Sequence, residues 1–117
     1  MNRDEIMSMP AEQLCIEIAR RMGWADIFVE NTRLIGSYRG AFGRMCPIPE
    51  YPNEIGAVMP LLAEMVDEGL TIGIYKENGL WVFDTDEDQT WVMSKQLPDA
   101  ISRAWLMWKE KNENEPR

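Results

Sequence analysis

The sequence contains no histidine, and this absence bears on both catalysis and metal binding. Histidine is the commonest general base near neutral pH and the commonest metal ligand. The two cysteines, Cys15 and Cys46, lie far apart and form neither a CxxC pair nor a zinc ribbon, which predicts free thiols. We therefore predict a protein that is not an enzyme, with no metal, no cofactor and no catalytic residues.

Long apolar runs and basic residues are also scarce. No stretch approaches the ~20 apolar residues of a membrane span, and the first residues, with Asp4 and Glu5, lack the order of a signal peptide. These features predict a cytoplasmic protein with no membrane contact. The 12 basic residues are outnumbered by 20 acidic ones, a net charge of −8. This charge disfavours duplex nucleic acid and favours solubility or a basic protein partner.

The stretch from Gly69 to Asp84 carries the strongest structural signal. Alternating apolar residues lead to the pair Asn78-Gly79, which tolerates positive φ, and an apolar segment leads back. We predict a β-hairpin with a two-residue turn. The predicted pairs are Glu77 with Leu80, Lys76 with Trp81, Tyr75 with Val82, and Ile74 with Phe83. One face then carries Leu70, Ile72, Ile74, Trp81 and Phe83.

Three amphipathic helices are predicted around this hairpin. The first begins near Pro10 and ends at Gly23, the second begins at Pro52-Asn53, and the third begins at Pro98. One extra turn over residues 4–7 is expected to dock Ile6. In the third helix, Trp105 and Trp108 are predicted to anchor the core.

The second helix has a broad apolar pattern and an internal proline. Pro60 predicts a kink or a division into two short helices, because proline removes the hydrogen bond to the carbonyl of Gly56. The predicted apolar face consists of Ile55, Val58, Met59, Leu62, Met65 and Val66.

Further strands are predicted on both sides of these helices. Residues 24–29 are β-like, a short strand is expected around residues 34–38 within an irregular loop over 31–49, and residues 90–93 form a third strand beside the hairpin. The acidic loop from Asp84 to Asp88 lacks the central glycine of a calcium loop, and Lys95 stands where the closing glutamate would fall. We predict a solvated turn there.

Helices with one apolar face each, combined with an antiparallel sheet, require a layered arrangement. We predict an α+β sandwich in which three helices pack on an antiparallel sheet of about three to four strands, built on the 70–83 hairpin. Residues 1–110 form a single domain, and the polar segment 111–117 is predicted to be a disordered tail. The opposite face of the sheet, with Tyr75, Leu80 and Val82, is also apolar, so helices or a second subunit in a homo-oligomer are expected to cover it.

Several short motifs point to a known family. They are Met22-Gly23-Trp24 after the first helix, the Ile48-to-Ile55 entry to the second, Trp81-Val82 in the hairpin, and Leu97-Pro98-Asp99-Ala100-Ile101 at the last helix. Together they resemble the phage ABA sandwich family of small bacteriophage and prophage proteins. Where that family shows Ser-Thr-Asp after tyrosine, this chain has Pro52-Asn53-Glu54, so no role of that serine is carried over. The resemblance implies an α/β sandwich and a phage accessory protein in the host bacterial cytoplasm, without established activity.

The segment over residues 31–49 is the basic part of an acidic chain. It has three arginines, three glycines and no acidic residue, whereas the rest has 9 basic and 20 acidic residues, a charge of −11. Arginine forks and glycine backbone N–H groups bind phosphates, and a tyrosine stacks on a base. We predict a site for an anionic, nucleotide-type signal molecule, which the protein would sequester as an anti-defence or host-interaction factor. Its residues would be Arg33, Ser37, Tyr38, Arg39, Arg44 and Tyr51.

Two alternatives stay open. The glycine spacing matches neither the P-loop nor the dinucleotide fingerprint, and the alternative is a solvated loop whose arginines neutralise nearby acids. The second alternative is an acidic inhibitor of a host or defence protein. In that case Glu64, Asp67 and Glu68, with the loop over residues 84–88, would form an acidic edge beside an exposed apolar patch that steers a basic partner.

Overall fold

A computed structural model describes residues 1–38 and 44–114 of the chain. These residues form two three-stranded antiparallel sheets and four helices, which is the layered α+β class predicted from the sequence. The elements in order are α1 (Arg3–Ser8), α2 (Ala11–Arg21), β1 (Trp24–Glu30), β2 (Arg33–Tyr38), β3 (Met45–Pro47), α3 (Ile55–Asp67), β4 (Ile72–Glu77), β5 (Leu80–Thr85), β6 (Trp91–Ser94) and α4 (Leu97–Asn114).

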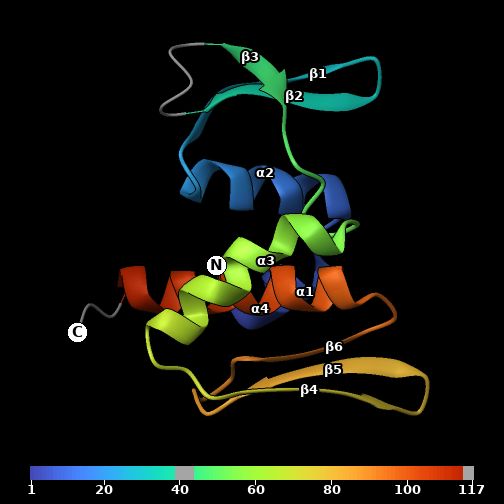
Figure 1. Cartoon of the computed structure of the whole chain (residues 1–117), viewed down its shortest axis with the longest axis vertical. Coiled ribbons are helices and arrows are strands. Elements are labelled where there is room, and N and C mark those ends of the chain that lie inside the picture. The colour runs from blue at the N-terminus through green and yellow to red at the C-terminus, as the bar shows by residue number, and fades with distance from the viewer. Residues whose placement is uncertain (39–43, 115–117) are drawn as a thin grey trace.

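The helices lie between the two sheets. Figure 1 shows the sheet of β1, β2 and β3 at one end of the molecule, next to α2, and the sheet of β4, β5 and β6 at the other end, next to α3 and α4. Helix α4 contacts β5, β6, α1, α2 and α3, so it is the element on which the layers meet. The sheet predicted around the hairpin is the second of these, and the first sheet is an addition to the predicted architecture.

The hairpin has the predicted register. Glu77 pairs with Leu80 and Ile74 with Phe83, and the two intervening pairs are also as predicted. Asn78 and Gly79 have φ of 51° and 79°, the left-handed conformation that a two-residue turn of this kind requires. Strand β6 then pairs with β5, which places Val92 beside Phe83 in the buried layer against the helices.

The first sheet depends on close packing at one glycine. A Cβ on Gly36 would lie 3.2 Å from the Ala25 carbonyl oxygen and 3.2 Å from Cδ1 of Ile48. Ile48 also donates its N–H to the Leu34 carbonyl oxygen at 3.0 Å, which fixes the chain after β3 to β2. Glycine is therefore needed at position 36 because the backbone and Ile48 approach so closely.

The core is centred on α4. Trp105 and Trp108 are buried, as predicted, and Ile6 of α1 is buried with them. Helix α4 continues to Asn114, so residues 111–114 of the predicted disordered tail are helical, and residues 115–117 lie outside the described residues. The helix is held there by ion pairs of Lys111 with Glu87 and of Glu113 with Arg21.

Helix α3 is one continuous helix with Pro60 inside. Of the two predicted alternatives, a kink or a division into two short helices, the division is therefore wrong. Both Pro60 and Gly56 are exposed, so water can satisfy the Gly56 carbonyl that proline leaves without a partner. The buried residues are Val58, Leu61 and Met65, so the buried face covers only part of the predicted apolar face.

Candidate functional site

The residues predicted to bind an anion are spread along the first sheet. Arg33 begins β2 and pairs with Glu30, whereas Tyr38 ends the strand. At ~3.3 Å per residue, the two ends of this strand lie roughly 16 Å apart. Ser37 pairs with Met45, which brings Ser37, Tyr38 and Arg44 to the same end of the sheet. Arg39 lies outside the described residues.

Tyr51 is part of the core and not of a binding surface. Its side chain is 3% exposed, and burial raises its pKa to about 12, although a hydrogen bond with Trp24 acts in the opposite direction. The Tyr38 ring lies against Trp24, with 5.2 Å between the ring centroids. Tyr51 is therefore not available to stack on a nucleotide base.

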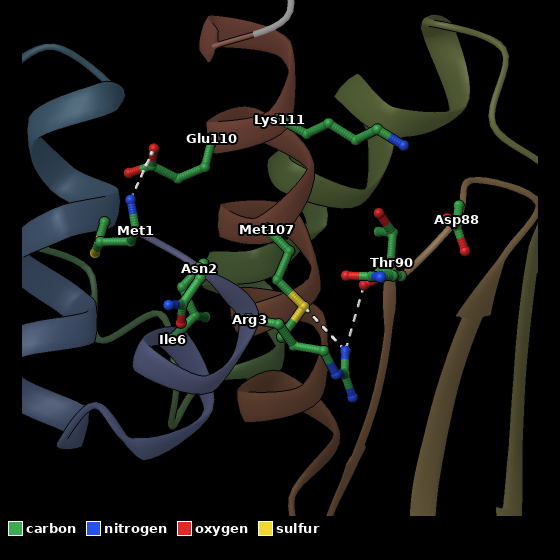
Figure 2. A pocket seen from close by; sticks show the side chains of 10 residues that line it. Met1, Asn2, Arg3, Ile6, Asp88, Thr90, Met107, Glu110 and Lys111 are labelled. Atoms are coloured by element: carbon green, nitrogen blue, oxygen red, sulfur yellow. Dashed lines mark hydrogen bonds and ion pairs between the residues drawn. The ribbon is translucent and has the colours of Figure 1, made fainter.

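The larger cavity lies between α1, α4 and the turn before β6, with a volume of about 420 Å³ (Figure 2). The Met1 amino group and the side chains of Arg3, Glu110 and Lys111, which line it, already contact other groups of the protein. The Met1 amino group lies 3.5 Å from Glu110, and Lys111 Nζ lies 3.4 Å from Glu87. The Arg3 guanidinium stacks on the Trp91 ring, 3.9 Å from its centroid, and donates to the Gln89 carbonyl. These contacts tie α1 to β6 and α4, and we assign them a structural role.

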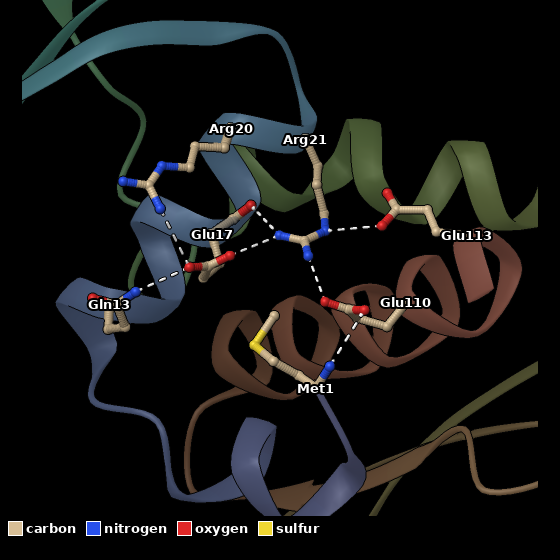
Figure 3. Close-up of polar contacts among 7 residues, drawn as sticks. All are labelled: Met1, Gln13, Glu17, Arg20, Arg21, Glu110 and Glu113. Atoms are coloured by element: carbon tan, nitrogen blue, oxygen red, sulfur yellow. Dashed lines mark hydrogen bonds and ion pairs between the residues drawn. The ribbon is translucent and has the colours of Figure 1, made fainter.

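A second group of charges joins α2 to α4 around Arg21 (Figure 3). Arg21 Nη1 lies 2.8 Å from Glu17, Nη2 contacts Glu110, and Nε lies 3.6 Å from Glu113. Burial lowers the pKa of the Arg21 guanidinium, but the three glutamates outweigh burial and the pKa is raised. This network connects the two layers of the molecule and leaves the arginine permanently charged.

Among the described residues, exposed apolar side chains form a row on α3, which we call the α3 stripe: Ile55, Met59, Leu62 and Val66. At 100° per residue these four positions fall within about 60° around the helix axis. Ile55, Met59 and Val66 are 48%, 50% and 53% exposed, and Leu62 is half-buried. The sequence analysis placed these residues in the core, because a broad apolar face does not show which part of it the fold buries.

Acidic residues stand at both ends of the α3 stripe. Glu54 precedes the helix and Asp67 and Glu68 stand at its end, where the negative end of the helix dipole adds to their charge. Glu64 forms an ion pair with Lys109 of α4. Residues 50–68 include five acidic and no basic residues. Acidic residues therefore stand at both ends of the α3 stripe, whereas Glu64 falls on the opposite side of the helix at 100° per residue.

Other exposed apolar residues lie on the outer faces of the sheets. Phe28 pairs with Ile35 in the first sheet, and Tyr75 pairs with Val82 in the second. Phe28 and Tyr75 are exposed. Phe28 belongs to β1 and Tyr75 to β4, so both are exposed apolar residues outside α3 and serve as controls for it.

The comparisons with known proteins leave the family open. No family model matches the chain, and no curated protein and no solved structure is significantly similar to it. The resemblance to phage ABA sandwich proteins stays a prediction. Among the described residues, none of the helices combines the length and apolar character needed to cross a membrane, and no group of three potential metal ligands converges.

Proposed function

We propose that this protein is a non-catalytic binding protein that docks a basic, amphipathic segment of another protein along α3. The observation that carries the proposal is the α3 stripe, an exposed apolar row within a segment of five acidic and no basic residues. Positions i, i+4, i+7 and i+11 are those through which one helix contacts another. A partner with apolar residues at this spacing and basic residues beside them would match both properties.

The energetics favour such a partner. Burying the exposed half of Ile55, Met59 and Val66 contributes roughly 1 kcal/mol for each side chain. The carboxylates of Glu54, Asp67 and Glu68, at the two ends of the α3 stripe, attract a basic segment over about one Debye length, ~8 Å at physiological ionic strength. Apolar contact then sets the affinity, and charge sets the association rate and the choice of partner. In the phage setting that the sequence resemblance implies, the partner would be a host or defence protein that the binding inhibits.

The test is affinity capture from a bacterial lysate with three forms of the chain. Wild type is expected to retain a basic protein that is lost at high salt. Met59→Lys with Val66→Lys is expected to abolish retention, because it removes apolar area and adds charge of the partner's sign. Tyr75→Lys adds one positive charge at an exposed position in strand β4, outside α3, and this variant is expected to retain the partner. An empty wild-type lane, or equal retention by the α3 variant, contradicts the proposal.

We also keep a second proposal, the binding of an anionic nucleotide at one end of the first sheet. The observation in its favour is that Ser37, Tyr38 and Arg44 share that end. Replacing Arg33, Arg39 and Arg44 with glutamine is expected to abolish any thermal shift caused by mono-, di- or cyclic nucleotides. The α3 variant is expected to keep that shift. No wild-type shift at millimolar nucleotide would exclude this site.

A further inference from the structure

A smaller cavity lies where the start of α2, the turn between β1 and β2, and the chain leading into α3 meet. Its volume is about 160 Å³. At the ~30 Å³ that a water molecule occupies in the liquid, it holds about five non-hydrogen atoms. The lining residues are Ala11, Glu12, Cys15, Val29, Thr32, Leu34, Ile48, Glu50, Pro52 and Asn53. We call it the α2–α3 cavity.

The lining combines apolar walls with two carboxylates. Val29 and Leu34 are cross-strand partners on one wall, and Ile48 is held against the same strand by its bond to the Leu34 carbonyl. Glu12 and Glu50 are both exposed. Among the described residues, neither carboxylate forms an ion pair with a basic side chain. The lining therefore combines apolar side chains with two carboxylates and, within the described part of the chain, it contains no basic side chain.

The negative charges of Glu12 and Glu50 both act on the Cys15 thiol, which also lines the cavity. Burial raises the pKa of the Cys15 thiol, and the negative charges of Glu50 and Glu12 also raise it, although a hydrogen bond with the Tyr51 backbone acts in the opposite direction. The thiol donates to the Pro49 carbonyl oxygen at 3.2 Å and stays neutral. An anion is therefore disfavoured here, and a cation carried on an apolar stem is favoured.

A lysine or arginine side chain has this chemistry. Its methylene stem packs on apolar walls while its charged head stays beside carboxylates and water. A lysine side chain has five non-hydrogen atoms, which is the number that the cavity holds. The position also fits, because Pro52 and Asn53 immediately precede α3 and the α3 stripe begins at Ile55. A segment docked along α3 that extends beyond its first turn reaches this cavity.

We propose that the α2–α3 cavity binds one lysine side chain of the segment docked along α3. This inference rests on the proposed function for the identity of its ligand, but the cavity's preference for an alkyl cation can be measured alone. The first probe is n-butylammonium, which is a lysine side chain without its backbone. The second is n-butyrate, which has a similar apolar chain and the opposite charge.

Each probe is titrated to about 100 mM into ¹⁵N-labelled protein, a range suited to ligands of this size. Butylammonium is expected to shift the amide signals of Cys15, Thr32 and Asn53 in a saturable way, and butyrate is not. Glu12→Gln with Glu50→Gln is expected to remove the saturable shift. The control, Glu5→Gln with Glu77→Gln, makes the same charge change at exposed positions away from α3 and from the cavity lining, and is expected to keep it. Equal binding of both probes, absence of any shift, or an unchanged shift in the Glu12/Glu50 variant overturns the inference.

The same variants separate this inference from the proposed function. If the Glu12/Glu50 variant weakens capture of the partner about tenfold and its control does not, both stand. If capture depends on Met59 and Val66 but not on Glu12 and Glu50, the cavity inference is wrong and the proposed function stands. If butylammonium binds but no partner is captured, the cavity stands as a cation site and the proposed function is wrong.

Discussion

At the scale of single residues, two adjacent leucines of α3 are expected to differ in how much they contribute to stability. Leu61 is fully buried and Leu62 is half-buried on the α3 stripe. Leu61→Ala is expected to lower the free energy of unfolding by about 2–5 kcal/mol, because it leaves a cavity in the core. Leu62→Ala is expected to cost about 1 kcal/mol or less. Urea denaturation of the two variants checks the contrast, and equal losses would mean that the face of α3 is misassigned.

Tyr51 gives the stability a dependence on alkaline pH. Burial raises its pKa to about 12, so the folded protein holds the phenol neutral while the unfolded chain loses the proton near its ordinary pKa of 10. The folded state therefore binds more protons, and its stability is complete below about pH 10 and is lost as pH rises toward 12. The loss amounts to about 2–3 kcal/mol at most.

Tyr51→Phe tests this linkage. The substitution is expected to cost about 1 kcal/mol at pH 7, because it removes the hydrogen bond with Trp24. Between pH 9 and about 11 it is expected to flatten the decline in stability. Denaturant midpoints of both proteins across this range provide the measurement, and parallel curves would contradict it.

At the scale of elements, the hairpin turn is the most sequence-determined feature. Gly79 has φ of 79°, so Gly79→Val is expected to lower stability by about 1–3 kcal/mol, whereas Gly79→Asn costs a fraction of that. A Cβ at this position meets open space, so backbone conformation alone accounts for the difference. Thermal unfolding of the two variants is the measurement. Similar melting temperatures would contradict the turn type.

This turn also shows why the register of the hairpin could be predicted, whereas for the first sheet the segments over residues 24–29 and 34–38 were predicted but not their pairing in a separate sheet. Asn78-Gly79 and the alternation around it are local, so the register follows from adjacent residues. The first sheet depends on contacts between distant residues, such as Ile48 against Gly36, and on a shift in register where Asp26 has φ of 53°. Neither contact nor shift leaves a periodic pattern in the sequence.

Surface features that depend on nearby residues could be predicted from the sequence, whereas those that depend on the packing of distant elements could not. Acidic residues near the end of α3 are visible in the sequence, and their proximity to one another follows from the helix. The exposure of Ile55, Met59 and Val66 depends on where α4 lies, which only the folded chain determines. The arginines of residues 31–49 are close in sequence, but an extended strand separates Arg33 from Arg44 because each residue adds ~3.3 Å.

At the scale of the whole molecule, the Arg21 network joins α2 and the first sheet to α4 and the second sheet (Figure 3). The side chains of Arg21, Glu17 and Glu110 are 17%, 16% and 10% exposed, so this is a largely buried set of charges. Removing one partner from such a set leaves carboxylates without compensation. The network therefore couples the two layers, although replacing all of it by apolar residues need not cost stability.

Arg21→Ala is expected to lower stability by about 2–4 kcal/mol and to loosen the first sheet more than the second. The reason is that α2, which carries the first sheet, loses its charged connection to α4. Amide hydrogen exchange is the measurement, with faster exchange expected in β1 and β2 than in β4 and β5. Arg20→Ala is the matched control, because Arg20 pairs with the same Glu17 from a side chain that is 61% exposed. Arg21→Met combined with Glu110→Gln is expected to restore most of the lost stability, and uniform exchange across both sheets in Arg21→Ala would show that other contacts couple the layers.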